Sequence, residues 1–147
     1  MNNYDDPNGI GLEFWKNGQT ISGQYKSGKL DGVAKVEEPD RSIYWGQFKD
    51  GINDGYTTYL SKSTGQVCIG QFKDKKLNGY GVNKQVADGV TYHGQYKDDK
   101  REGYGRYSQP SRYEYDGQWK DGLKDGEGIF KCIRTNKVLR AKWNKGK

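Results

Sequence analysis

A repeat of 23 or 24 residues constrains this chain more than any other feature. The string Gly-Gln-aromatic-Lys begins at Gly23, Gly46, Gly70, Gly94 and Gly117. A degraded start follows at residue 141, and residues 9–11 match the second half of a repeat. A fixed period of this length is typical of arrays in which each repeat packs against its neighbours. We therefore expect a repeat domain over residues 9–147, preceded by an N-terminal tail over residues 1–8.

The period also predicts where the repeats divide. The expected segments are a half repeat at 9–22, full repeats at 23–45, 46–69, 70–93, 94–116 and 117–140, and a partial repeat at 141–147.

Alternation within each repeat indicates β-strands. Along residues 92–97 alternate side chains share a face of a strand, so Tyr92 and Tyr96 point the same way as Gly94. His93 and Gln95 then point the opposite way. The turn sequences between such runs, for example Asp121-Gly122, favour β-hairpins.

The recurring glycines predict how the hairpins pack. Glycines on one face of a strand leave a shallow floor, and an aromatic ring from the adjacent strand can lie across it. A single hairpin is marginally stable, whereas stacked hairpins bury their rings in a continuous row. We expect an all-β protein: an elongated, twisted, single-layer antiparallel sheet of stacked β-hairpins, with one aromatic face.

Composition supports burial by rings. Leu, Ile, Val and Phe make up only 24 of the 147 residues, whereas Phe, Trp and Tyr together number 20. There is no apolar run of membrane-spanning length and no secretory leader in the first residues. The two cysteines are no disulfide framework. These features favour a cytoplasmic protein with free thiols.

The repeat resembles the MORN repeat (membrane occupation and recognition nexus), whose pattern is Tyr-x-Gly-x-Trp/Tyr-x-x-Gly-x-x-x-Gly-x-Gly. Residues 115–128 match every position of that pattern, and the resemblance covers roughly residues 9–146. It implies a stack of β-hairpins and a scaffold that brings partners together, often at membranes, in the cytoskeleton or in cilia. The repeats occupy almost the whole chain, so we expect no attached catalytic domain.

Few residues are suited to catalysis or to metal binding. The only histidine is His93, which strand parity places on the face opposite Tyr92 and Tyr96. Cys68 occupies a slot held by Tyr in sister repeats and reads as a small buried residue, and Cys132 is also expected to be packed. A closed zinc site needs about four Cys or His ligands. We therefore predict a protein that is not an enzyme and has no metal and no cofactor.

The aromatic face is the predicted binding surface for a protein partner, either a helix or an extended segment. Most of its ring area is expected to form the core, but a single-layer sheet cannot cover every ring. The predicted partner-binding residues are Tyr25, Tyr44, Phe48, Phe72, Tyr92, Tyr96, Tyr115 and Trp119.

Positive charge gathers near the C-terminus. Residues 1–116 carry 16 acidic and 16 basic side chains, whereas residues 117–147 carry nine basic and three acidic ones, a net of +6. This basic patch is either a solvated end or a dock for an acidic protein surface or acidic phospholipids. Nucleic acid is disfavoured, because the basic residues do not interleave with the rings. The patch comprises Lys131, Arg134, Lys137, Arg140, Lys142, Lys145 and Lys147.

The leading functional hypothesis is a non-enzymatic scaffold that binds another protein along the aromatic groove, in a cytoskeletal or ciliary assembly. The main alternative is a peripheral membrane module that binds acidic phospholipids through the basic patch. A carbohydrate- or choline-binding repeat fits less well, and an enzyme would need a partner subunit to supply the chemistry. The repeat also starts and stops mid-repeat, which predicts end-to-end self-association or capping by a partner strand.

Overall fold

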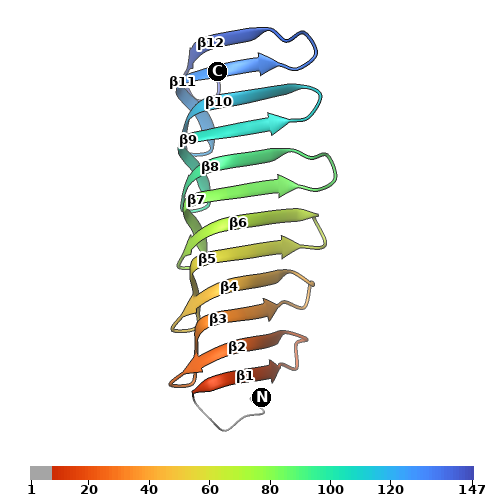
Figure 1. Ribbon diagram of the computed structural model, residues 1–147, viewed down its shortest axis with the longest axis vertical. Helices are drawn as coiled ribbons and strands as arrows, with labels where there is room; N and C mark the ends of the chain where they lie inside the picture. Colours follow the sequence, from red (N-terminus) through yellow and green to blue (C-terminus); the bar gives the residue numbers. More distant parts are fainter. Residues whose placement is uncertain (1–7) are drawn as a thin grey trace. The chain divides into compact units, whose positions relative to one another are not determined.

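Short antiparallel strands joined by tight turns make up the protein (Figure 1). The structure is a computed structural model that describes residues 8–147, and within these residues it contains strands and turns but no helix. The predicted all-β sheet of consecutive hairpins is confirmed. The predicted tail over residues 1–8 lies, apart from its last residue, outside the described part. The described residues form two compact units, residues 8–75 and 76–147.

Each unit is an antiparallel sheet whose strands pair in chain order. Within residues 8–75 the strands are β1 (Gly9–Phe14), β2 (Thr20–Lys26), β3 (Lys29–Glu37), β4 (Ile43–Lys49), β5 (Ile52–Ser61) and β6 (Gln66–Lys73). Within residues 76–147 they are β7 (Lys76–Gln85), β8 (Thr91–Lys97), β9 (Lys100–Gln109), β10 (Tyr113–Lys120), β11 (Leu123–Cys132) and β12 (Val138–Trp143). The predicted repeat boundaries themselves stay predictions.

The tightest turns contain two residues with positive φ. Between β10 and β11, Asp121 has φ of 50° and Gly122 has φ of 83°. Two such residues form a type I′ turn, whose twist matches that of the flanking strands. Asp99 replaces glycine in the turn between β8 and β9 and still adopts φ of 66°. Its carboxylate accepts a hydrogen bond from the Leu77 amide at 2.8 Å, which helps to hold this uncommon conformation.

A bulge follows the first glycine of the repeat. In β10 and β11 the pairing moves from Gly117↔Gly128 to Trp119↔Lys124, so residues 125–127 lie opposite Gln118 alone. The Gln118 side-chain oxygen accepts a hydrogen bond from the Glu127 amide at 2.7 Å. This contact supplies a partner to an amide that the ladder leaves unpaired. The same glutamine-to-amide contact is made by Gln24, Gln47 and Gln95.

One side of each sheet is packed, as alternation predicts. Along β8, Tyr92 and Tyr96 are buried whereas His93 is exposed. The Tyr92 ring lies across Gly105 of the adjacent strand, and the Tyr115 ring lies across Gly128 in the same way. The predicted glycine floor is therefore confirmed. We call the side that carries these tyrosines the packed face and the opposite side the open face.

Candidate functional site

The rings predicted to bind a partner lie on the packed face and are mostly buried. Seven of the eight rings are buried, with exposed fractions from 0% for Tyr115 to 8% for Tyr25. The eighth, Tyr44, is half-buried. They pack against one another edge to face, for example Tyr115 against Trp119 with ring centroids 5.3 Å apart. The rings thus form the packed layer on one face of each sheet. Their role in partner binding stays a prediction.

The open face of the second unit contains a groove of about 850 Å³. Gly105, Gly117 and Gly128 are cross-strand partners on β9, β10 and β11, and their backbones form its floor. Tyr80 and Tyr104 stand beside this floor with 58% and 62% of their surface exposed. The remaining lining residues are His93, Arg106, Asp116, Glu127, Ile129, Arg140, Ala141 and Lys142.

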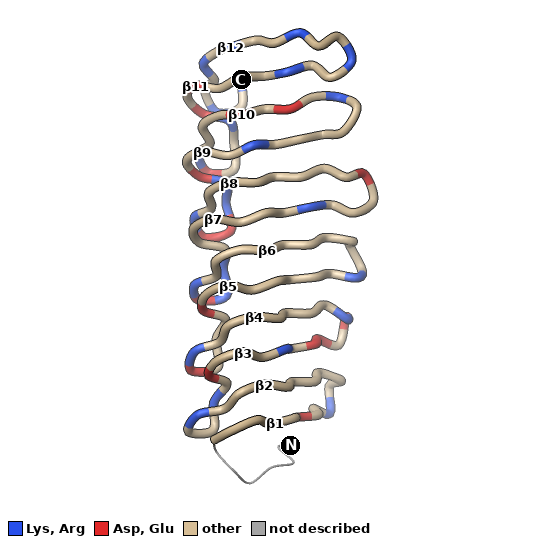
Figure 2. The backbone as a smooth tube through the Cα atoms, in the orientation of Figure 1, with Lys and Arg blue, Asp and Glu red and all other residues tan. Residues whose placement is uncertain are grey.

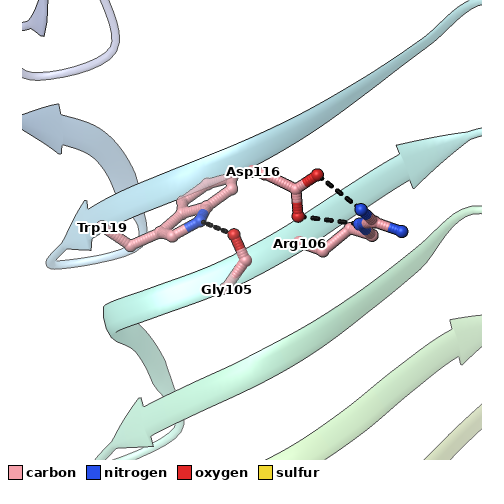
Figure 3. A network of polar contacts seen from close by, with 4 residues as sticks. All are labelled: Gly105, Arg106, Asp116 and Trp119. Carbon is pink, nitrogen blue, oxygen red and sulfur yellow. Dashed lines mark hydrogen bonds and ion pairs between the residues drawn. The ribbon is translucent and has the colours of Figure 1, made fainter. Parts of the chain in front are cut away.

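Two polar contacts hold the groove in shape (Figure 3). Arg106 on β9 donates two hydrogen bonds of 2.7 Å to the Asp116 carboxylate on β10. These bonds and the carboxylate charge raise the pKa of Arg106 above its ordinary value. From the packed face, the Trp119 indole donates a hydrogen bond of 3.0 Å to the carbonyl oxygen of Gly105. The groove floor is therefore fixed from both sides.

The histidine and the cysteines are not brought together by the fold. His93 is exposed on the open face, as predicted, and it also lines the groove, which was not predicted. Cys68 is buried, as predicted, with 6% exposure. Cys132 is only partly buried, because the strand ends at this residue and the chain beyond it is exposed. Hydrogen bonds with Thr135 lower the pKa of the Cys132 thiol.

No cluster of three or more His, Cys, Asp or Glu side chains suited to a metal ion occurs between residues 8 and 147. The described part of the chain also has no helix with the length and apolar character that membrane crossing requires.

The basic patch is spread over several surfaces of the second unit. Lysine and arginine recur along β11, β12 and the turn that joins them (Figure 2). Only Arg140 and Lys142 line the groove, because these alternate residues of β12 face the open side. Lys131 is half-buried, and the other members are exposed. The patch as a binding site stays a prediction.

Two groove residues, Tyr80 and Tyr104, are absent from the predicted site. Each stands between two glycines of a Gly-Tyr-Gly sequence, and strand alternation places it opposite the buried rings. That alternation was the signal that could have identified them. In the first unit, Tyr56 occupies the equivalent position after Gly55 and is 63% exposed. Exposed rings thus recur on the open face, whereas the more regular ring positions fill the core.

The model of the MORN repeat family matches residues 68–82, 92–111 and 115–133. The chain is a MORN-repeat protein. The resemblance seen in the sequence is thus confirmed, and two of the three matched segments lie within the second unit, over the strands that form the groove. A comparison with curated proteins finds no significant match. MORN repeats are non-catalytic modules that generally take part in protein or membrane interactions.

Proposed function

We propose that this MORN-repeat protein is a non-enzymatic scaffold that binds an extended segment of a partner protein in the groove of its second unit. The observation that carries the proposal is the pairing of two exposed tyrosines, Tyr80 and Tyr104, with an open glycine floor. A groove of about 850 Å³ has room for several side chains of a bound segment.

The chemistry of the lining suits recognition of a polypeptide. Tyrosine combines a large apolar ring with a polar hydroxyl and is enriched at the energetic centre of protein interfaces. Charges of both signs surround the rings, including the Arg106–Asp116 pair and Lys142. They offer hydrogen bonds to backbone and polar groups of the segment. The described lining contains no Ser, Thr or Cys beside His93, which supports binding rather than nucleophilic catalysis.

The cellular setting rests on the family resemblance. We propose a cytoplasmic location, within a cytoskeletal or ciliary assembly. Binding to acidic phospholipids remains the alternative, and the exposed positions of Arg134, Lys137 and Lys145 favour it. Tyr80 and Tyr104 lie outside the basic patch, whereas Arg134 and Lys137 lie outside the groove, so that substitutions at these residues separate the two functions.

The test begins with the full chain, tagged and cross-linked in its own cells so that the protein contacting the groove is identified. The affinity of that purified partner is then compared for Tyr80→Ala/Tyr104→Ala and for Tyr56→Ala. Truncating two central aromatic anchors is expected to weaken binding by about tenfold or more. Tyr56→Ala is the matched control, because Tyr56 has the same repeat position and exposure in the first unit.

Unchanged affinity of the groove variant would contradict the proposal. Loss of binding to anionic vesicles, in a variant that removes Arg134 and Lys137, would instead support the membrane alternative.

A further inference from the structure

Two cations stand on the packed face, where sister repeats have uncharged residues. Arg101 and Lys124 follow the hairpin turns of β8–β9 and β10–β11 at the same position of the repeat. The equivalent positions in the other repeats hold Leu30, Asn53 and Leu77, all of them buried. A charged side chain in this layer loses part of its hydration and needs compensation.

Aromatic rings supply part of that compensation. The Arg101 guanidinium carbon lies 5.1 Å from the ring centroids of Tyr92 and Tyr107, and 5.0 Å from that of Trp119. The Lys124 ammonium lies 5.0 Å from the ring centroids of Tyr113 and Tyr115, and 5.5 Å from that of Phe130. Ring faces attract cations, but they carry no net charge and leave both positive charges in place.

No carboxylate neutralises either cation. Among residues 8–147 the ion pairs join Lys35 to Glu37 and Arg106 to Asp116, so that neither pair includes Arg101 or Lys124. The neighbouring acids are engaged by backbone amides instead: Glu102 accepts from Asp121, and Asp125 accepts from Lys145.

The two cations also influence one another. Burial lowers the pKa of Lys124, and the positive charge of Arg101 lowers it further. This effect has the sign expected for two like charges that share a partly buried region.

Both cations line one small cavity. It has a volume of about 290 Å³ and is lined further by Tyr107, Tyr113, Trp119 and Leu123. Tyr107 and Tyr113 are stacked, with their ring centroids 5.7 Å apart, and both line this cavity. The cavity therefore offers two positive charges without a competing carboxylate among the described lining residues.

We propose that this cavity binds a phosphoryl group through Arg101 and Lys124. A phosphate monoester carries a charge of about −1.5 to −2 at neutral pH, which matches two cations better than the single charge of a carboxylate does. Arginine and lysine are the usual phosphate ligands in proteins. The site lies on the face opposite the groove and does not depend on the proposed partner binding.

The first experiment titrates the full chain with inorganic phosphate against chloride at equal ionic strength, followed by NMR. Saturable shifts of the Arg101 guanidinium Nε–H and of the Tyr107 and Tyr113 rings are expected. Arg101→Leu and Lys124→Leu should each weaken binding by about tenfold or more. Leucine is chosen because Leu30 and Leu77 fill the equivalent positions. Lys97→Leu, which removes an exposed cation of β8 that lines neither this cavity nor the groove, should bind as the wild type does.

Absence of saturable shifts in the wild-type protein would overturn the proposal, as would equal binding by the leucine variants. The wild-type shift map decides the question even if a leucine variant does not fold, since binding elsewhere would move other resonances. Arg101→Lys retains the charge and should restore most of the affinity that Arg101→Leu loses.

A second arm identifies the source of the phosphoryl group. The full chain is sedimented with phosphatidylcholine vesicles that contain one-fifth phosphatidic acid, and with vesicles of phosphatidylcholine alone. Binding to the acidic vesicles that Arg101→Leu abolishes would assign the phosphoryl group to a lipid headgroup. Phosphate binding without vesicle binding would assign it to a soluble compound or a phosphorylated side chain. Either result upholds the cavity as a phosphoryl site.

Discussion

Glycines of the repeat serve different purposes at the scale of single residues. Gly122 supplies positive φ in an open turn, and a Cβ there would have no atom within 4 Å. Gly128 instead gives room to a ring, since a Cβ at that position would lie 2.5 Å from the Tyr115 ring. Tyr115 is completely buried and cannot move without disturbing its neighbours.

We expect Gly128→Ala to lower the free energy of unfolding by about 2 kcal/mol, because the Tyr115 ring must shift within a packed layer. Gly122→Ala is the matched control. It should cost only about 1 kcal/mol, from its positive φ. Urea unfolding of both variants checks the difference. A Gly128→Ala variant no less stable than Gly122→Ala would contradict the packing described here.

Residue-scale packing was largely predictable from the sequence. Alternation along β8 correctly separated Tyr92 and Tyr96 from His93, because a strand has a fixed period of two. The same alternation placed Tyr104 on the other face without revealing that it lines a groove. Alternation assigns a face, but exposure and concavity depend on how neighbouring strands pack.

At the scale of elements, a repeated glutamine holds the bulge in four of the hairpins. Gln118 lies opposite three residues of β11, and its side-chain oxygen takes the place of a ladder partner for the Glu127 amide. The sequence displays this glutamine five times without explaining it. A mismatch of one residue against three shifts the pairing by two residues and so leaves the alternation of faces unchanged, which is why alternation alone cannot reveal the bulge.

Replacing Gln118 by Met, which has a similar length but no oxygen, should speed hydrogen exchange at the Glu127 amide. The loss of this hydrogen bond should lower the free energy of unfolding by about 1 kcal/mol. Exchange is measured by NMR at neutral pH. Gln118→Glu keeps an acceptor oxygen at the same place and should keep the amide protected. Equal exchange in the wild type and Gln118→Met would show that the glutamine does not hold the bulge.

At the scale of the whole molecule, the many packed tyrosines link stability to alkaline pH. Burial raises the pKa of Tyr92 to about 12 and raises those of Tyr25, Tyr113 and Tyr115 as well. The unfolded chain therefore releases these protons at lower pH than the folded protein does. Their contribution to stability is intact below about pH 10 and is lost as the pH rises above it.

We expect the unfolding midpoint in urea to fall steadily as the pH is raised beyond about 10. Lys124 has the opposite effect: its pKa is lowered, so that loss of its buried positive charge at higher pH adds stability to the folded protein. It is a single group, however, against four tyrosines. Tyr92→Phe should be less stable at neutral pH, since it loses the hydrogen bond to the Gln95 carbonyl, and should show a shallower decline. A midpoint unaffected by alkaline pH would contradict this expectation.

The position of the candidate site was the least predictable feature. The repeat pattern predicts binding on the regular rings, such as Phe72 and Trp119, and in the structure these rings are 7% and 5% exposed. Regular spacing is what packing in a repeat requires, so the most periodic rings become the core. Residues that depart from the pattern on the packed face, such as Arg101 and Lys124, are not explained by packing alone.

We propose above all that a segment of a partner protein lies in the groove beside Tyr104. The most direct measurement places a photo-crosslinking phenylalanine analogue at position 104, and separately at position 56, in the full chain within its own cells. We expect position 104 to cross-link to one partner protein through a single short segment, and position 56 not to cross-link to that segment. Identical cross-links from both positions, or none from position 104, would contradict the account.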